Sequence, residues 1–185
     1  MEIKQGWLVG AKHVPSPNFD KRPKGDEIPS LLIIHNISLP PGQFGGSYID
    51  QLFTNTLSAS EHPFFREIEG LRVSAHCLIR RDGEIVQYVS FTDRAWHAGV
   101  SLYQEREKCN DFSIGLELEG TDECDFTDVQ YTQLVELTQS LISLYPQIED
   151  NITGHSDIAP SRKTDPGPHF NWSSYRSLLT SRLSR

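Results

Sequence analysis

Residues 31–36 read Leu-Leu-Ile-Ile-His-Asn, four apolar side chains in a row that end at two polar ones. A strand with one face in water alternates apolar and polar residues, whereas a strand covered on both faces is apolar throughout. The run therefore predicts a central strand in a sheet that is covered on both sides. His35 closes this strand, so its ring is expected to project at the end of the sheet.

Three further segments predict strands. Residues 74–80 and 84–89 flank Asp82-Gly83, a dipeptide that favours a hairpin with a type I′ turn. Residues 112–119 read FSIGLELE, which places Ile, Leu and Leu on one face and Ser, Gly, Glu and Glu on the other.

Helical patterns alternate with these strands. Thr127 and Gln130 fit a capping box, a stripe of leucines follows at 134, 137, 141 and 144, and Pro146 ends the pattern. A shorter helix is predicted near residues 48–53, and a last one from Trp172 with Asn171 as its N-cap. Interleaved strands and helices indicate a mixed α/β fold, in which helices flank a central mixed β-sheet.

The 185 residues fit a single domain, because no repeat, low-complexity tract or linker divides them. Residues 1–29 are rich in Pro, Lys and Gly and predict an irregular lead-in. Residues 40–72 show little periodicity outside the short helix. Long irregular segments often form cleft walls or lids, so we expect this one to border the functional site. Its closing over bound substrate is a further hypothesis.

The composition is that of a soluble globular protein, with 37% hydrophobic and 23% charged residues. A formal net charge of −8 disfavours nucleic acid and anionic lipid as partners. The N-terminus has no apolar run of signal-peptide length, and three cysteines cannot all pair within the chain. We therefore expect a cytoplasmic protein, monomeric, whose partner is a small molecule.

The segment 154–168, GHSDIAPSRKTDPGP, combines polar side chains with a backbone restricted by prolines. A catalytic zinc ion takes about three His, Asp or Glu ligands and keeps one position open. His35, His155 and Asp165 could supply such a set. The residue types leave alternatives open, because Asp157 is a rival carboxylate and either Glu117 or Glu119 could be a general base. Without a metal, His35 would be a hydrogen-bonded strand-end histidine and Asp165 a turn residue.

Several long motifs carry a resemblance that narrows these alternatives. They are VPSPNFDKRP, HNISLPPGQFGG, RVSAHCLIRRDGEIVQYV, RAWHAGVS, KCNDFSIGLELEGT and GHSDIAPSRKTDPGP, and together they span nearly the whole chain. The sequence resembles the AmpD family of N-acetyl-anhydromuramyl-L-alanine amidases, which is grouped with bacteriophage T7 lysozyme-type amidases and peptidoglycan recognition proteins. The resemblance implies their amidase fold and hydrolysis of the amide bond between a muramyl lactyl group and L-alanine, in cell-wall recycling.

The resemblance also assigns roles to residues. It places the ligands of one zinc ion per chain on His35, His155 and Asp165, and not on Asp157. It selects Glu117 as the catalytic glutamate, which would act as general base and acid. Lys163 matches a lysine near the metal and would stabilise the oxyanion of the tetrahedral intermediate.

The resemblance also suggests four residues that could contact the substrate, and each has an alternative structural role or a departure from the family pattern. Arg72 could pair with a peptide carboxylate or be a surface arginine, and Asn36 could bind substrate or cap the strand end. Trp96 could stack on a sugar or belong to the core. Lys108 stands where relatives have arginine, so the charge is kept but the guanidinium fork is lost. His76 and His97 match positions that are not ligands, and are expected to support neighbouring groups by hydrogen bonds.

Two other functions compete with this one. A non-catalytic peptidoglycan-binding module on the same fold would lack a metal ligand, whereas this sequence keeps all three together with Glu117 and Lys163. An amidase that acts on intact cell wall would need export, which the N-terminus does not suggest. The cytoplasmic recycling amidase is therefore the expected function.

Overall fold

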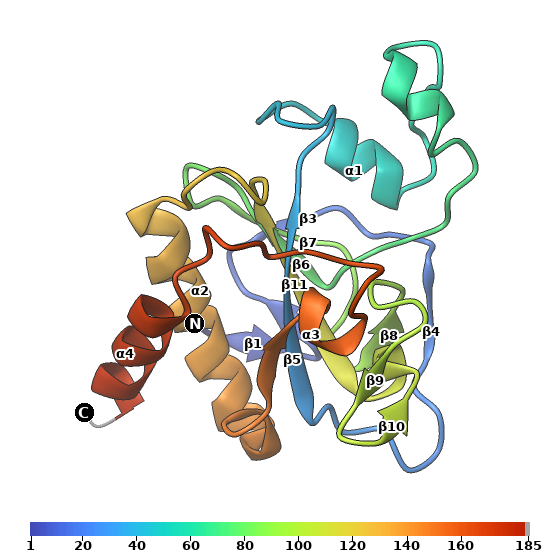
Figure 1. Ribbon diagram of the computed structural model, residues 1–185. Coiled ribbons are helices and arrows are strands. Elements are labelled where there is room, and N and C mark those ends of the chain that lie inside the picture. The colour runs from blue at the N-terminus through green and yellow to red at the C-terminus, as the bar shows by residue number, and fades with distance from the viewer. Residues whose placement is uncertain (184–185) are drawn as a thin grey trace.

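The computed structural model describes residues 1–183 and is built around a six-stranded mixed sheet (Figure 1). Across the sheet the strands are β12 (Ile152–Gly154), β5 (Leu31–Ile37), β11 (Ser113–Glu119), β6 (Cys77–Ile79), β7 (Ile85–Gln87) and β3 (Lys12–His13). Neighbouring strands are parallel except β6 and β7, which form an antiparallel hairpin. Because β12, β5 and β11 are parallel neighbours, their carboxyl ends meet at one edge.

Helices cover both faces of the sheet. The long helices α2 (Asp128–Leu144) and α4 (Trp172–Leu183) lie on one side, and the short helices α1 (Tyr48–Phe53) and α3 (His155–Ile158) lie on the other (Figure 1). Three 3₁₀ helices occupy Pro63–Arg66 (η1), Cys109–Asp111 (η2) and Pro146–Ile148 (η3). The predicted mixed α/β fold with a central mixed sheet is confirmed.

Strand β5 shows why its sequence is apolar without alternation. Leu32 and Ile34 belong to the core that packs under α2 and α4, while Leu31 and Ile33 pack with Ile158 of α3 on the opposite face. All four are fully buried. His35 follows Ile33 on the α3 face, which brings its ring to the edge of the sheet on that side.

The helix boundaries follow the predicted signals. Thr127 caps α2 through a capping box with Gln130, and the side chain of Asn171 accepts a hydrogen bond from the Ser174 N–H at the start of α4. Of the predicted leucine stripe, Leu134, Leu137 and Leu141 are buried, whereas Leu144 is 49% exposed. Tyr145, four residues after Leu141, packs against the core in its place.

The hairpin of β6 and β7 forms as predicted, but its turn does not. Only Gly83 has a positive φ, and its N–H bonds to the carbonyl of Arg80, whereas a type I′ turn needs positive φ at both central residues. The Arg80 N–H also bonds to the Glu84 carbonyl, so the loop holds three residues and ends in a glycine bulge.

Residues 1–29 are not irregular throughout, which corrects the prediction. They contain β1 (Ile3–Lys4), β2 (Trp7–Leu8), β3 and β4 (Phe19–Lys21), of which β3 joins the central sheet and β4 pairs with β8 (Asp93–Ala95). Strands of two or three residues carry too little alternation to be recognised. A further two-stranded hairpin joins β9 (Leu102–Tyr103) to β10 (Arg106–Glu107). Among the described helices, none has the length and apolar character needed to cross a membrane.

Candidate metal centre and active site

The parallel register at the edge of the sheet places three titratable side chains in one row. Glu117 of β11 pairs with His35 of β5, and Gly154 of β12 pairs with Ile34. His155 directly follows Gly154 and so lies beside His35. Residues paired in register present their side chains to the same face, so His155, His35 and Glu117 lie side by side on the α3 face.

Asp165 reaches this row from the loop that follows α3. The Ser156 N–H donates a hydrogen bond of 2.9 Å to the Asp165 carbonyl, which ties the loop back to the start of the helix. Asp165 Oδ2 then lies 2.9 Å from His35 Nδ1 and 3.0 Å from His155 Nδ1, and the two Nδ1 atoms are 3.0 Å apart. Three potential ligand atoms therefore converge on one point.

The outer contacts of the two imidazoles indicate where their protons lie. His155 Nε2 lies 3.1 Å from the Ala98 carbonyl, which can only accept, so Nε2 carries the proton. His35 Nε2 lies 2.9 Å from His97 Nδ1, and His97 Nε2 lies 3.3 Å from the Ser113 hydroxyl. If His35 Nε2 donates to His97 Nδ1 and His97 Nε2 donates to the Ser113 hydroxyl, both His35 Nδ1 and His155 Nδ1 are free to accept.

Two bare Nδ1 atoms and a carboxylate oxygen would repel one another without a cation between them. A tetrahedral zinc with ligands at about 2.0–2.1 Å separates them by about 3.3 Å, close to the spacing seen here. Burial lowers the pKa of His35 to about 4, an effect that Asp165 partly offsets, so the ring is neutral at pH 7 as a metal ligand must be. The donor set, its spacing and its protonation all fit zinc.

Asp157, the rival carboxylate, lies outside this cluster. Its Oδ2 accepts hydrogen bonds from the Thr153 hydroxyl at 2.8 Å and from the Gly154 N–H at 3.0 Å. The carboxylate therefore caps the start of α3, which is the ordinary role of an acidic residue in the first turn of a helix.

Glu117 and Glu119 point to the same face of β11 but have different surroundings. Glu119 accepts hydrogen bonds from the Gly45 and Arg81 N–H groups, and so joins two loops. Glu117 borders the same cleft as the metal cluster, and its Oε2 is buried without a hydrogen-bond partner among the described residues. Burial, helped by the nearby Asp165 carboxylate and opposed by Lys163, raises the pKa of Glu117 well above its usual value. Such a carboxyl group is suited to take up and release a proton near neutral pH.

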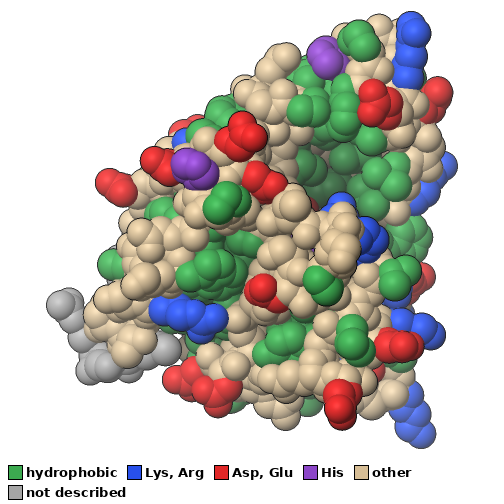
Figure 2. Space-filling view, viewed as in Figure 1, with side chains coloured by type: hydrophobic (Ala, Val, Ile, Leu, Met, Phe, Trp, Pro, Cys, Tyr) green, Lys and Arg blue, Asp and Glu red, His purple; other side chains and the backbone are tan. Residues whose placement is uncertain are grey.

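The cluster lies at the bottom of a groove of about 360 Å³. Apolar side chains form one wall, and most come from the segment 40–72: Leu52, Phe53, Phe64, Ile68 and Leu71. Figure 2 shows hydrophobic side chains gathered in a hollow next to this segment. The expectation that residues 40–72 border the site is confirmed, as is the helix at 48–53.

The predicted substrate-contacting residues differ in position. Asn36 and Trp96 line the groove, as does the exposed Lys163. Arg72 is exposed between two lining residues, Leu71 and Val73, but is not itself part of the lining. Lys108 does not line the groove and borders a neighbouring depression with Val100 and Arg162.

Asn36 and Trp96 each make a hydrogen bond that could not be predicted from the sequence. Asn36 donates a hydrogen bond of 2.7 Å to Asp122, and Trp96 donates one of 2.7 Å through its indole N–H to Asp20. Trp96 is partly exposed, so it belongs to the groove wall and not to the core. Both partners are distant in sequence, and only the fold brings them to the groove.

Comparison with known proteins shows the family to which the chain belongs. A family model described as N-acetylmuramoyl-L-alanine amidase matches residues 25–168. The 1,6-anhydro-N-acetylmuramyl-L-alanine amidase AmpD of Enterobacter cloacae is 66% identical over 180 residues, which cover 97% of this chain and 96% of the relative.

Solved structures extend the likeness to the fold. A crystal structure of a selenomethionine derivative of AmpD has a TM-score of 0.95 at 64% identity, covering 97% of this chain and 99% of that chain. The amidase AmiD of Escherichia coli, solved with anhydro-N-acetylmuramic acid-L-Ala-D-γ-Glu-L-Lys, has a TM-score of 0.58 at 26% identity, covering 93% of this chain and 60% of that chain. The amidase fold that the resemblance implied is thereby confirmed.

Proposed function

The chain belongs to the AmpD family of N-acetylmuramoyl-L-alanine amidases, and from this premise we propose zinc-dependent hydrolysis of the amide between the lactyl group of 1,6-anhydro-N-acetylmuramic acid and L-alanine. The observation that carries the proposal is the meeting of three acceptor atoms, from His35, His155 and Asp165, beside the buried carboxyl group of Glu117.

His35, His155 and Asp165 would hold one zinc ion per chain. Zinc, when bound, lowers the pKa of water from about 16 to about 7 and polarises a carbonyl oxygen. The two histidines would offer neutral rings through Nδ1, and the Asp165 carboxylate would offset part of the metal charge.

Glu117 acts as the general base and then as the general acid. Its carboxylate takes a proton from the attacking water, and the carboxylic acid so formed delivers that proton to the leaving amine of L-alanine. The raised pKa favours the first step, because it makes the carboxylate a stronger base. Its Oε2, which has no hydrogen-bond partner within residues 1–183, leaves an acceptor for the water.

Lys163 stabilises the negative charge that develops on the carbonyl oxygen. Lys163 lines the groove together with Glu117 and Asp165, and it lies two residues before Asp165 in the sequence. Removing one donor to such an oxyanion costs about 10²- to 10³-fold in rate in other hydrolases.

The groove matches the two chemical parts of a muropeptide. We assign Asn36 and Trp96, which line the groove, to the sugar and the adjoining peptide, and Arg72 and Lys108, which do not line it, to the peptide carboxylates. AmiD was solved with an anhydromuramyl tripeptide of this class. A free anhydromuropeptide is an intermediate of wall turnover, so we place the enzyme in cell-wall recycling. We also propose that it acts in the cytoplasm and as a monomer.

Metal analysis of purified variants tests the site. Wild-type protein is expected to contain about one zinc per chain, and His155→Ala and Asp165→Ala to lose both zinc and activity. Glu117→Ala is expected to keep zinc and lose hydrolysis, because it removes the base without removing a ligand. An active wild-type protein free of metal would overturn the mechanism.

A product assay tests the substrate. The enzyme is incubated with a purified anhydromuropeptide and, in parallel, with intact sacculi, and released peptide with an L-alanine N-terminus is quantified. Release from the anhydromuropeptide is expected to be much faster. Release from sacculi alone would instead favour an amidase of the intact wall.

A further inference from the structure

One short segment supports both histidines of the metal cluster. His97 Nδ1 lies 2.9 Å from His35 Nε2, and the carbonyl of the next residue, Ala98, lies 3.1 Å from His155 Nε2. The imidazole contacts therefore depend on where the backbone at 97–98 lies. A shift of this segment would turn both rings at once.

This segment has few backbone bonds of its own. It follows the end of β8 and lies outside the strands of the central sheet. Ser74 fixes its start, through bonds between the Ser74 N–H and the Trp96 carbonyl and between the Trp96 N–H and the Ser74 hydroxyl. The N–H groups of His97 and Ala98 are bound by a single side-chain atom instead.

That atom is Oδ1 of Asn110. It accepts a hydrogen bond of 3.1 Å from the His97 N–H and one of 2.8 Å from the Ala98 N–H. Asn110 is 7% exposed and lies in η2, just before β11. The single Oδ1 atom of Asn110 thus takes the place of the backbone hydrogen bonds that a neighbouring strand would provide.

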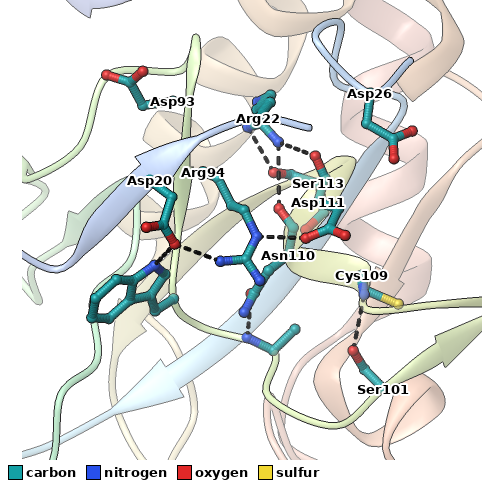
Figure 3. A network of polar contacts seen from close by, with 12 residues as sticks. Asp20, Arg22, Asp26, Asp93, Arg94, Ser101, Cys109, Asn110, Asp111 and Ser113 are labelled. Carbon is teal, nitrogen blue, oxygen red and sulfur yellow. Dashed lines mark hydrogen bonds and ion pairs between the residues drawn. The ribbon is translucent and has the colours of Figure 1, made fainter. Parts of the chain in front are cut away.

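Asn110 is itself held in place by a polar network (Figure 3). The buried guanidinium of Arg22 donates to the carbonyls of Asn110, Asp111 and Ser113, and Arg94 pairs with the side chain of Asp111. The backbone around Asn110 is therefore fixed from both sides. Its Oδ1 has a defined position relative to β11, the strand that carries Glu117.

We propose that Asn110 is a positioning residue for the metal centre. Through the backbone at 97–98 it sets the direction of the His35 and His155 rings, so that both Nδ1 atoms face Asp165. The inference rests on the proposed zinc site, and it predicts that zinc affinity depends on a side chain that touches neither the metal nor its ligands.

The shape of asparagine allows a discriminating set of variants. Asn110→Leu has nearly the same size but no acceptor, and Asn110→Ala removes the acceptor without adding a branched side chain. Asn110→Asp keeps an oxygen in the same place and can accept both N–H bonds. Asn18→Leu is the control for the loss of a buried asparagine, because Asn18 is 2% exposed and its side-chain amide donates hydrogen bonds to the carbonyls of Phe53 and Val73.

Zinc affinity is measured by competition with a chromophoric chelator, and the absorption spectrum of the cobalt(II)-substituted proteins reports ligand geometry. Outer contacts of metal-bound histidines typically contribute about 10- to 100-fold in affinity. We expect a loss of this size and an altered cobalt spectrum in Asn110→Leu and Asn110→Ala. Asn110→Asp should restore both, and Asn18→Leu should leave both unchanged.

Three results would overturn the inference. They are wild-type zinc affinity in Asn110→Leu and Asn110→Ala, equal weakening in Asn18→Leu, and no recovery in Asn110→Asp. A wild-type chain that binds no zinc would overturn the proposed function as well, and so separates the two failures. If Asn110→Leu does not fold, Asn110→Ala and Asn110→Asp still give the comparison.

Discussion

Two glutamates on one face of β11 show how neighbouring residues of the same type acquire different functions. Glu117 borders the groove and Glu119 joins the Gly45 and Arg81 backbones. Glu117→Gln should lower kcat by about 10²- to 10⁴-fold, the usual contribution of a general base, while zinc content and stability stay close to wild type. The measurement is kcat beside metal content and thermal unfolding.

Glu119→Gln is the matched control for this prediction. It weakens two charge-assisted hydrogen bonds and the approach of Arg80, so it should lower the free energy of unfolding by about 1–3 kcal/mol. Turnover by the folded fraction should change little. If Glu119→Gln abolished kcat while Glu117→Gln did not, the assignment of the base would be wrong.

Gly115 explains why the His97 ring can lie where it does. A Cβ added at Gly115 would lie 2.5 Å from His97 Cγ and Nδ1, so only glycine leaves room for the imidazole against the strand. Gly115→Ala should push the ring away from His35, weaken zinc binding, and cost about 1–3 kcal/mol of stability from overpacking. Isothermal titration with zinc and chemical denaturation measure the two effects.

Ile114→Val is the control on the opposite face of the same strand, where Ile114 belongs to the core under α2. It should cost about 0.5–1.5 kcal/mol of stability and leave zinc affinity unchanged. Equal zinc affinity in Gly115→Ala and wild type would show that the His97 ring does not control His35.

At the scale of single residues, the sequence indicates which residue types could form a metal site better than it indicates which side chains contact one another. His35 at the end of an apolar run and the carboxylates of segment 154–168 can be recognised as candidates for a metal site. The choice between Asp165 and Asp157 depends on which carboxylate caps α3, and that between Glu117 and Glu119 on loops that arrive from residues 45 and 81. Spacing along the chain does not contain these contacts, so only the family resemblance indicated the choice.

Among the elements, the short helix α1, which has six residues, is held in place by the polar contacts of one side chain, that of Asp50. Asp50 accepts hydrogen bonds from the buried Tyr88 hydroxyl at 2.5 Å and from Arg80 at 3.0 Å, and Lys12 lies 3.3 Å away. The same helix supplies Leu52 and Phe53 to the groove wall. The anchor therefore ties the wall of the groove to the hairpin of β6 and β7.

Asp50→Ala should destabilise the protein by about 2–4 kcal/mol, because it leaves the buried Tyr88 hydroxyl without its acceptor and removes one of the carboxylates that surround the buried Arg80 guanidinium. We also expect KM to rise more than kcat falls, since the wall moves while the metal cluster does not. Steady-state kinetics and urea unfolding measure these effects. Lys12→Ala, which removes the exposed partner, should change stability by less than about 0.5 kcal/mol. Unchanged stability in Asp50→Ala would rule out the anchor.

Elements with strong local signals were predictable, and those defined by tertiary contacts were not. The boundaries of α2 follow from the Thr127–Gln130 capping box and Pro146, which act within a few residues of the helix ends. The three-residue loop at Gly83 and the placement of β3 beside β7 depend on pairing between distant segments. Leu144 fits the helical stripe, but it is exposed at the end of α2. The period of the helix does not show where along its length the buried core ends.

At the scale of the whole molecule, buried histidines couple folding to pH. His76 is fully buried, accepts a hydrogen bond from the Gly115 N–H through Nδ1, and lies 3.1 Å from the Asp93 carbonyl through Nε2. Burial, together with the nearby Arg22 cation, lowers the pKa of His76 from 6.5 to about 3. The folded protein therefore holds this ring neutral at a pH where the unfolded chain would protonate it.

The sign of the pH dependence follows from the number of bound protons. Between pH 6.5 and 3 the unfolded state binds more protons at this site than the folded state, so stability rises with pH in that window. The contribution of His76 is complete above pH 6.5 and is lost as the pH falls, at about 1.4 kcal/mol per pH unit. His35 changes stability in the same direction, since burial also lowers its pKa.

His76→Asn isolates this contribution, because the amide oxygen can accept the Gly115 N–H but does not titrate. Denaturation of the metal-free proteins at pH 6.5, 5.5 and 4.5 should give a slope of unfolding free energy against pH that is smaller in His76→Asn by about 1.4 kcal/mol per pH unit. The comparison uses slopes, so a lower stability of the variant at neutral pH does not affect it. A proton titration of the wild-type ring by NMR gives an independent measurement, in which His76 should stay neutral down to about pH 4. Equal slopes together with a His76 ring that titrates near pH 6.5 would mean that the surroundings of His76 are open to water.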